Sequence, residues 1–174
     1  MFTIIVEILN SFNQRFYDSI ISNLRFDELT CECGHSGCLT IHGYYSRYVQ
    51  EQDEKLRIKI TRVKCSVCGK THALLMSSLV PYSQIPLENQ REIIVSHEDG
   101  ESVSQICDDH PQIDENSIKA VIQRFKLYWK DRLISKGISL SSPGTLIRCC
   151  FENYSAQFMQ NRNTAFNRLY LIPT

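Results

Sequence analysis

Apolar and polar positions change their spacing along the chain, and these changes predict its secondary structure. Over residues 1–30, apolar side chains such as Phe16, Ile20 and Leu24 recur at helical spacing, which predicts one amphipathic helix of uncertain extent. Over residues 31–81 the patterns are shorter and favour strands. We therefore expect a helix and then strands in the first half of the chain.

The central region predicts three strands, at about 39–49, 56–61 and 73–80. Across 56–61, Leu and Ile alternate with Arg, Lys and Thr, which gives that strand one apolar face and one polar face. The alternation slips at Arg62 and Val63, as it does at a β-bulge. We expect these strands to form a small antiparallel sheet.

Beyond the predicted strands the spacing becomes helical. We expect a first helix at 87–97, a short second helix opened by a capping box at 102–105, and a third helix at about 115–135. Asp114 suits the N-cap of the third helix, and Gly137 suits its end. The apolar positions of the third helix share one buried stripe, which is made by Ile118, Ile122, Phe125 and Trp129.

Eight cysteines suggest more than an ordinary globular domain, because their placement is uneven. The apolar start of the chain lacks a basic segment and a cleavage site, and no apolar run is long enough for a membrane span. We therefore expect a cytoplasmic protein with no membrane partner, whose cysteines bind metal rather than form disulfides. The clustered cysteines are Cys31, Cys33, Cys38, Cys65 and Cys68.

The CSVCG segment at 65–69 predicts half of a zinc site, because two thiolates at this spacing bind one metal ion and the glycine permits the tight turn. A redox pair and free buried cysteines are the alternatives, but no βαβ pattern accompanies the motif. Both cysteines of this segment and two of the three in 31–38 would hold a structural Zn²⁺. Among those three, Cys33 is favoured by the glycine that follows it, and His35 is an outside candidate. No metal role is expected for Cys107, Cys149 and Cys150.

Two surfaces carry the residue types that contact DNA. The third helix would present groups for base edges and phosphates, and the second strand would present a basic face to a phosphate backbone. The helix candidates are Asn116, Ser117, Lys119, Gln123 and Arg124. The strand candidates are Arg57, Lys59, Arg62 and Lys64. The alternatives are an ordinary three-helix bundle with a solvated basic face, and a ribbon whose core is covered by tyrosines.

The distribution of charge bears on the DNA hypothesis in two ways. The formal net charge is zero, whereas DNA-binding domains are commonly basic. The charge is nevertheless segregated. Residues 41–72 hold seven Lys or Arg and three acids, residues 116–136 hold six and one, and residues 86–115 hold one and nine. The two basic stretches agree with DNA contacts, and an ordinary solvated surface would also account for them.

Three segments resemble a family of small bacterial proteins, mainly from Firmicutes, that are often labelled transposase-like or domain of unknown function. They are CECGHSGCLTIHGYY at 31–45, RVKCSVCGKTHALL at 62–75 and LVPYSQI at 79–85, with a weaker similarity that extends to QFMQ at 157–160. A ribbon followed by helices also opens many insertion-sequence transposases. The resemblance implies a DNA-binding protein of a mobile element. Transposase ribbons normally open with C-x-x-C, whereas this chain opens with C-x-C, which leaves the ligand assignment open.

The sequence therefore predicts an α+β fold, in which a small antiparallel zinc-ribbon sheet precedes a helical, helix-turn-helix-like bundle. We expect an N-terminal helix at 1–30, the ribbon at 31–82, the helical domain at 83–137, and a partly helical tail at 138–174. Within the tail, one possible helix covers about 146–159.

The predicted function is that of a non-catalytic, zinc-containing protein of a transposable element, which binds double-stranded DNA and acts with a separately encoded transposase. A transposase core needs three acidic residues on an RNase-H-like fold, and too few residues follow the predicted helices to form one. The alternatives are a zinc-ribbon module for protein interactions and a degenerate transposase fragment. The oligomeric state stays open.

Overall fold

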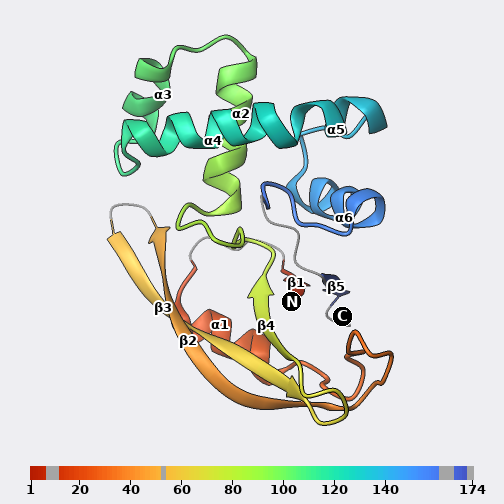
Figure 1. The fold of residues 1–174 in the computed structure, drawn as a ribbon. Coiled ribbons are helices and arrows are strands. Elements are labelled where there is room, and N and C mark those ends of the chain that lie inside the picture. Colours follow the sequence, from red (N-terminus) through yellow and green to blue (C-terminus); the bar gives the residue numbers. More distant parts are fainter. Residues whose placement is uncertain (7–11, 52–53, 161–166, 172–174) are drawn as a thin grey trace.

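The computed structural model describes residues 1–6, 12–51, 54–160 and 167–171, and over these it forms a mixed sheet with one helix against it and a separate helical layer (Figure 1). The strands of the sheet follow the order β2-β3-β4-β1-β5. The strands are β1 (Phe2–Ile5), β2 (Leu39–Glu51), β3 (Glu54–Cys65), β4 (Thr71–Met76) and β5 (Arg168–Leu171). The helices are α1 (Gln14–Ser22), α2 (Leu87–Glu98), α3 (Val103–Asp109), α4 (Glu115–Tyr128), α5 (Lys130–Lys136) and α6 (Pro143–Tyr154). The α+β class is confirmed.

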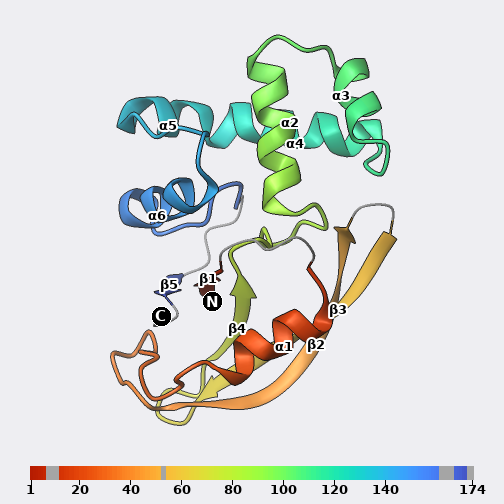
Figure 2. The same ribbon diagram turned by 180° about the vertical axis from the view of Figure 1, so that it is seen from behind.

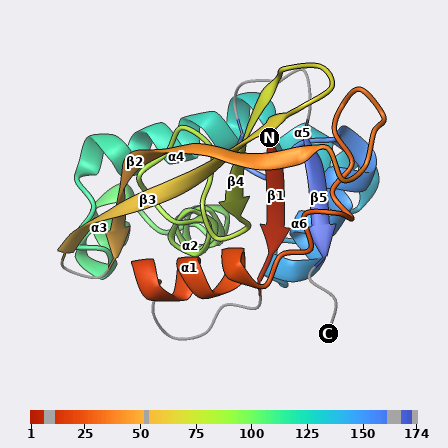
Figure 3. The same cartoon turned by 90° about the horizontal axis from the view of Figure 1, so that it is seen from below.

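The sheet is larger than expected and is not wholly antiparallel. Strands β2, β3 and β4 pair antiparallel as predicted, but β1 runs parallel to both β4 and β5. Figure 3 shows β4, β1 and β5 side by side, with the long hairpin of β2 and β3 running across them. The prediction of a purely antiparallel sheet is therefore wrong for β1 and β5, the two strands that extend the sheet beyond β4.

The prediction of one N-terminal helix is wrong over Phe2–Ile5 and right over Gln14–Ser22, and its part at 7–11 lies outside the described residues. Strand β1 is buried between two neighbours, with Thr3 and Ile4 fully enclosed. A parallel strand that is covered on both sides reads as a continuous apolar run, so its sequence shows no alternation that would distinguish it from a helix.

The hairpin of β2 and β3 contains the expected irregularity, although on the opposite strand. Its register shifts between Ile41 and Gly43, which face Val63 and Arg62. The extra residue is therefore His42, on β2. The bulge was expected at the level of Arg62, and a slip in the alternation of one strand does not reveal which strand of the pair carries the additional residue.

Helix α1 closes a gap between β3 and β4, which pair only over Arg62–Lys64 before they diverge. The Tyr17 hydroxyl accepts a hydrogen bond from the Thr61 amide (2.8 Å) and donates one to the Leu74 carbonyl (2.9 Å). On the same side, the amide group of Gln14 bonds both backbone groups of Lys59. Figure 2 shows α1 lying against this part of the sheet. Two side chains thus satisfy backbone groups that a further strand would otherwise pair.

The helical layer begins as predicted. Helix α2 matches the expected 87–97, and the capping box of Ser102 and Gln105 opens α3. Asp114 accepts a hydrogen bond from the Ser117 amide as the N-cap of α4, and Gly137 ends α5 at a positive φ of 60°. The four residues of the expected apolar stripe are all buried.

The single helix expected at 115–135 is in fact two helices, because the chain breaks at Trp129. This residue adopts φ −123° and ψ −33°, and its fully buried indole donates a hydrogen bond to the Gln160 carbonyl at 3.3 Å. A contact with residue 160 is not visible in the local spacing, so the periodicity predicts an uninterrupted helix. The helix expected at 146–159 is confirmed in part, because α6 ends at Tyr154.

Buried side-chain hydrogen bonds join the helical layer to the sheet. The fully buried Gln157 donates to the Ser77 carbonyl at 2.7 Å and to the Leu79 carbonyl at 3.1 Å. Ser77 and Leu79 follow directly after β4, so these bonds fix the start of the helical layer relative to the sheet. Across the described part of the chain, no helix has the length and apolar character that crossing a membrane would require.

Replacing Tyr17 with Phe tests the closure by α1. Burial raises the pKa of Tyr17 to about 12, so its hydroxyl remains a donor at neutral pH. Without it, a buried amide and a buried carbonyl lose their partners, which should cost about 1–3 kcal/mol in the free energy of unfolding. Urea unfolding followed by circular dichroism measures this. Tyr44→Phe, in which an exposed residue loses the same atom, should change stability little. Equal stability of the two variants would contradict the role assigned to Tyr17.

Candidate metal centre

Two loops at one end of the hairpin bring four cysteine sulfurs together. The first loop precedes β2 and carries Cys31 and Cys33, and the second joins β3 to β4 and carries Cys65 and Cys68. The four Sγ atoms all lie within 4.8 Å of one another. The fold thus brings together two segments that are about thirty residues apart in the sequence.

The distances between these sulfurs fit a tetrahedral zinc site. Cys31 Sγ lies 3.6 Å from Cys68 Sγ, and Cys33 Sγ lies 3.7 Å from Cys65 Sγ. A Zn–S bond of about 2.3 Å implies an S···S edge of about 3.8 Å in a regular tetrahedron. Four thiolates without a carboxylate or water ligand are typical of a structural zinc site rather than a catalytic one. The donor set therefore suits Zn²⁺.

Each loop makes a tight turn around the sulfurs that is closed by the amide of a glycine. The Gly34 amide donates to the Cys31 carbonyl, and the Gly69 amide donates to the Cys65 carbonyl, both at 3.0 Å. Gly34 and Gly69 have φ values of 86° and 74°, a region in which a side chain would be strained. The glycine after each second cysteine is therefore what lets the chain turn back around the metal position.

The fifth clustered cysteine, Cys38, lies beside the four but outside the tetrahedral group. Its Sγ is 3.3 Å from Cys65 Sγ and donates to the His35 carbonyl at 3.1 Å. His35 contributes both its backbone and its ring to this arrangement, because its carbonyl also accepts from the Cys31 amide and its ring interacts with the Cys33 sulfur. Of the five candidates, the structure therefore groups Cys31 and Cys33 with the C-x-x-C pair. The remaining cysteines, Cys107, Cys149 and Cys150, lie against the helical core or within it.

Local hydrogen bonds favour the thiolate form at two of the four positions. The backbone amide of His35 lowers the pKa of Cys33, and the backbone amide of Cys68, 3.4 Å from the sulfur, lowers the pKa of Cys65. Burial raises the pKa of Cys31. A dication compensates the cost of the buried thiolate, because it stabilises the deprotonated sulfur directly.

The sequence analysis missed His72, which supports the centre from β4. Its ring is buried, and Nε2 lies 3.4 Å from Cys31 Sγ. Burial lowers the pKa of His72 to about 4, so the ring is neutral at physiological pH and can donate one N–H to the sulfur. The only sequence signal is a histidine four residues after Cys68, which is not a usual ligand spacing in combination with four cysteines.

The DNA candidates on α4 fall on two adjacent stripes. Asn116, Lys119 and Gln123 are exposed, and Lys119 forms an ion pair with Glu115 at 2.6 Å. Ser117 and Arg124 are half-buried and line a cavity of about 310 Å³, which the end of the hairpin also lines through Gln50 and Lys55. The hydroxyl of Ser117 donates to the Asp114 carboxylate at 2.7 Å, so its role is local.

The hairpin candidates are all exposed along β3, but the structure does not gather them into one cluster with α4. Lys59 Nζ lies 4.0 Å from the centre of the Tyr44 ring, and Arg62 donates to the Thr71 hydroxyl at 2.8 Å. Arg57 and Lys64 lie towards opposite ends of the same strand. These four residues therefore follow one strand without sharing one face: Lys59 packs on Tyr44, Arg62 lines the space beside Tyr45, and Lys64 precedes Cys65 at the metal centre.

Comparison with known proteins identifies one family. A family model described as a domain of unknown function, DUF6431, matches residues 30–124, which is more than half of the 174 residues. The match begins just before Cys31 and ends at Arg124, so it includes all four clustered sulfurs and most of α4. No curated protein and no solved structure matches the chain.

Cys65→Ser should lose the metal and lower the stability of the fold, because serine cannot replace a thiolate ligand. Cys38→Ser is the matched control, since Cys38 is equally buried and adjacent but outside the tetrahedral group. Zinc measured by mass spectrometry should fall well below one per chain in the first variant and stay near one in the second. The melting temperature should fall by about 2–4 °C for each kcal/mol lost. A Cys65→Ser protein that keeps both its zinc and its melting temperature would refute this centre.

Proposed function

Since the chain belongs to the DUF6431 family, we propose its function from its own residues: it is a zinc-containing protein that binds double-stranded DNA through α4. It serves a mobile element in a non-catalytic role. The four-cysteine centre is structural in this proposal, and it holds the hairpin in position beside the helical layer.

The observation that carries the proposal is the arrangement of α3 and α4. The seven-residue α3 is followed, after residues 110–114, by the fourteen-residue α4, and both helices pack with α2. A short helix, a turn and a longer helix are the parts of a helix-turn-helix, in which the second helix enters the major groove. One side of α4 is buried in the core, while its outer side remains exposed from its first turn onward.

The chemistry of the exposed side supports DNA as the partner. Asn116 and Gln123 carry amides that can bond adenine edges, and Lys119 can contact phosphate. Ala120, exposed between them, is small enough for the helix to approach a groove closely. The basic excess of residues 116–136, six against one, lies on the same helices, so the local charge favours DNA although the net charge is zero.

The non-catalytic part of the proposal is supported by the donor set of the centre. Catalytic zinc sites keep a coordination position for water or substrate, whereas four thiolates fill all positions of a tetrahedral ion. The mobile-element part is supported by the resemblance described for residues 31–85, which implies that a separately encoded transposase would supply the catalytic core.

A protein-interaction module is the second candidate function, and one observation favours it. Leu127, Tyr128 and Ile134, on α4 and α5, are exposed by 64%, 50% and 68%. Large apolar side chains grouped on neighbouring helices can form the centre of a protein interface. The transposase of the element is the partner that this surface would bind if both functions operate together.

Gln123→Ala should weaken binding to the preferred duplex by about 5- to 150-fold, the equivalent of the roughly 1–3 kcal/mol attributed to one base-specific contact. Lys119→Ala should weaken binding to all duplexes alike and reduce its salt dependence, because it removes one phosphate contact. Arg148→Ala, which removes an exposed arginine from α6, outside the basic stretch of 116–136, is the control and should bind normally. Fluorescence anisotropy over a series of salt concentrations measures all three.

If the unaltered protein binds no duplex even at low salt, while retaining its zinc, the DNA proposal is wrong. Co-purification with a transposase, lost in Leu127→Ser or Ile134→Ser, would then support the second candidate.

A further inference from the structure

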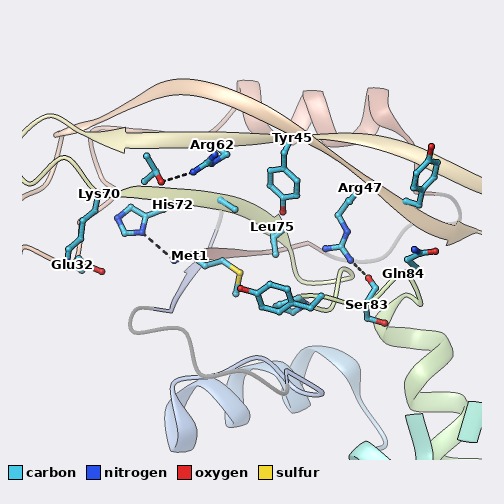
Figure 4. A pocket seen from close by; sticks show the side chains of 15 residues that line it. Met1, Glu32, Tyr45, Arg47, Arg62, Lys70, His72, Leu75, Ser83 and Gln84 are labelled. Carbon is cyan, nitrogen blue, oxygen red and sulfur yellow. Dashed lines mark hydrogen bonds and ion pairs between the residues drawn. The ribbon is translucent and has the colours of Figure 1, made fainter. Parts of the chain in front are cut away.

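A cavity of about 840 Å³ lies on the side of β2 and β3 that faces away from α1 (Figure 4). Its roof is formed by Tyr45, Arg47 and Arg62 on the hairpin. Leu75 on β4 and the loop at 81–84 form the opposite walls. Figure 4 shows Tyr45 and Arg47 pointing from the strands into this space. The volume is within the range of about 300–1,000 Å³ that is usual for small-molecule sites.

The cavity carries an excess of positive charge. Its one carboxylate, on Glu32, forms an ion pair with Lys70. No ion pair between described residues involves Arg47 or Arg62. Two guanidinium groups therefore face a common space without an acidic partner from the described part of the chain, which favours an anionic ligand.

Arg47 is fixed in place as a binding group would be. Its Nη2 donates to the carbonyls of Val80 (3.1 Å) and Ser83. The guanidinium also interacts with the Tyr45 hydroxyl beside it, and its five N–H donors exceed what these partners use. Burial lowers the pKa of Arg47, which reflects the cost of holding a cation away from water. An anion next to this group would offset that cost.

Aromatic rings provide the second recognition element. Tyr45 extends into the cavity from β2, and Tyr82 lines it from the loop at 81–84. Tyr82 has a φ of 63°, a conformation rare for a large side chain, and the residue is 66% exposed. Strained backbone that presents an aromatic ring beside a cavity is typical of functional sites.

We propose that this cavity binds one nucleotide unit with an unpaired base, whose ring stacks on tyrosine and whose phosphate contacts Arg47 and Arg62. Stacking rings combined with guanidinium groups are the usual means by which proteins bind single-stranded nucleic acid. A free mononucleotide has the same chemistry as a nucleotide within a strand. The inference rests on the proposed function for the choice of nucleic acid, but it concerns a surface distinct from the exposed side of α4.

The metal centre forms one end of this site. Lys70 and His72 follow the second metal loop, Glu32 lies within the first, and all three line the cavity. Loss of zinc should therefore impair nucleotide binding as well as the ribbon.

The test uses full-length, zinc-loaded protein, a fluorescent single-stranded oligothymidylate, and thymidine monophosphate as competitor. Tyr45→Leu and Arg62→Met remove the ring and one charge from the cavity. Tyr44→Leu is the matched control for the ring, because Tyr44 is the adjacent residue of β2 and does not line the cavity. Arg148→Met removes an exposed arginine from α6 and is the matched control for charge.

We expect each cavity variant to weaken binding of oligothymidylate by about 5- to 150-fold, in line with about 1–3 kcal/mol for one stacked base, and each control to bind normally. Competition by thymidine monophosphate would show that a free nucleotide suffices, and its absence would show that the ligand is a strand. An abasic strand should bind as weakly as the Tyr45→Leu variant binds oligothymidylate.

Normal binding by both cavity variants would overturn the inference, as would a native protein that binds neither probe. Duplex binding by Gln123→Ala is measured in parallel, so the two proposals fail separately. A native protein that binds the single strand but no duplex would contradict the proposal for α4 alone. A native protein that binds duplex but neither single-strand probe would contradict the proposal for the cavity alone.

Discussion

The mutual repulsion of four converging thiolates is the constraint on which the ribbon end of this protein depends. Sulfurs at 3.6 and 3.7 Å cannot all be ionised unless a cation lies between them. The two loops that carry them turn at Gly34 and Gly69, and their cysteines belong to the same apolar cluster as the buried Leu29, Leu39 and Val63. A metal ion at this position would add to that core and would remove the repulsion between the thiolates.

Where β3 diverges from β4, side chains take the place of strand pairing. Gln14 and Tyr17 occupy the gap where β3 leaves β4, and Gln157 connects the end of β4 to the helical layer. These polar groups are buried or sit at an edge, and each bonds backbone atoms. The long hairpin is consequently anchored at its metal end and along one side, while its other side borders the cavity.

The features that the sequence predicted well are those with a local physical signature. The C-x-x-C-G turn, the capping box at Ser102 and the stop at Gly137 depend on neighbouring residues alone, and the structure contains all three. The features it missed depend on distant partners. Strand β1 pairs with residues near 74 and 168, Trp129 contacts residue 160, and His72 reaches Cys31 through the fold. The cavity was missed for the same reason, because its residues come from six separate segments.

The position of β1 has a consequence for how the chain folds during its synthesis. This strand is made before both of its partners, which are β4, about seventy residues later, and β5, more than one hundred and sixty residues later. The cysteine loops and the hairpin, by contrast, are complete once residue 76 has been made. The hairpin can therefore form early, whereas one edge of β1 must wait until residues 168–171 have been made. Contacts between such distant segments slow folding, so the pairing of β5 with β1 determines when the sheet is closed.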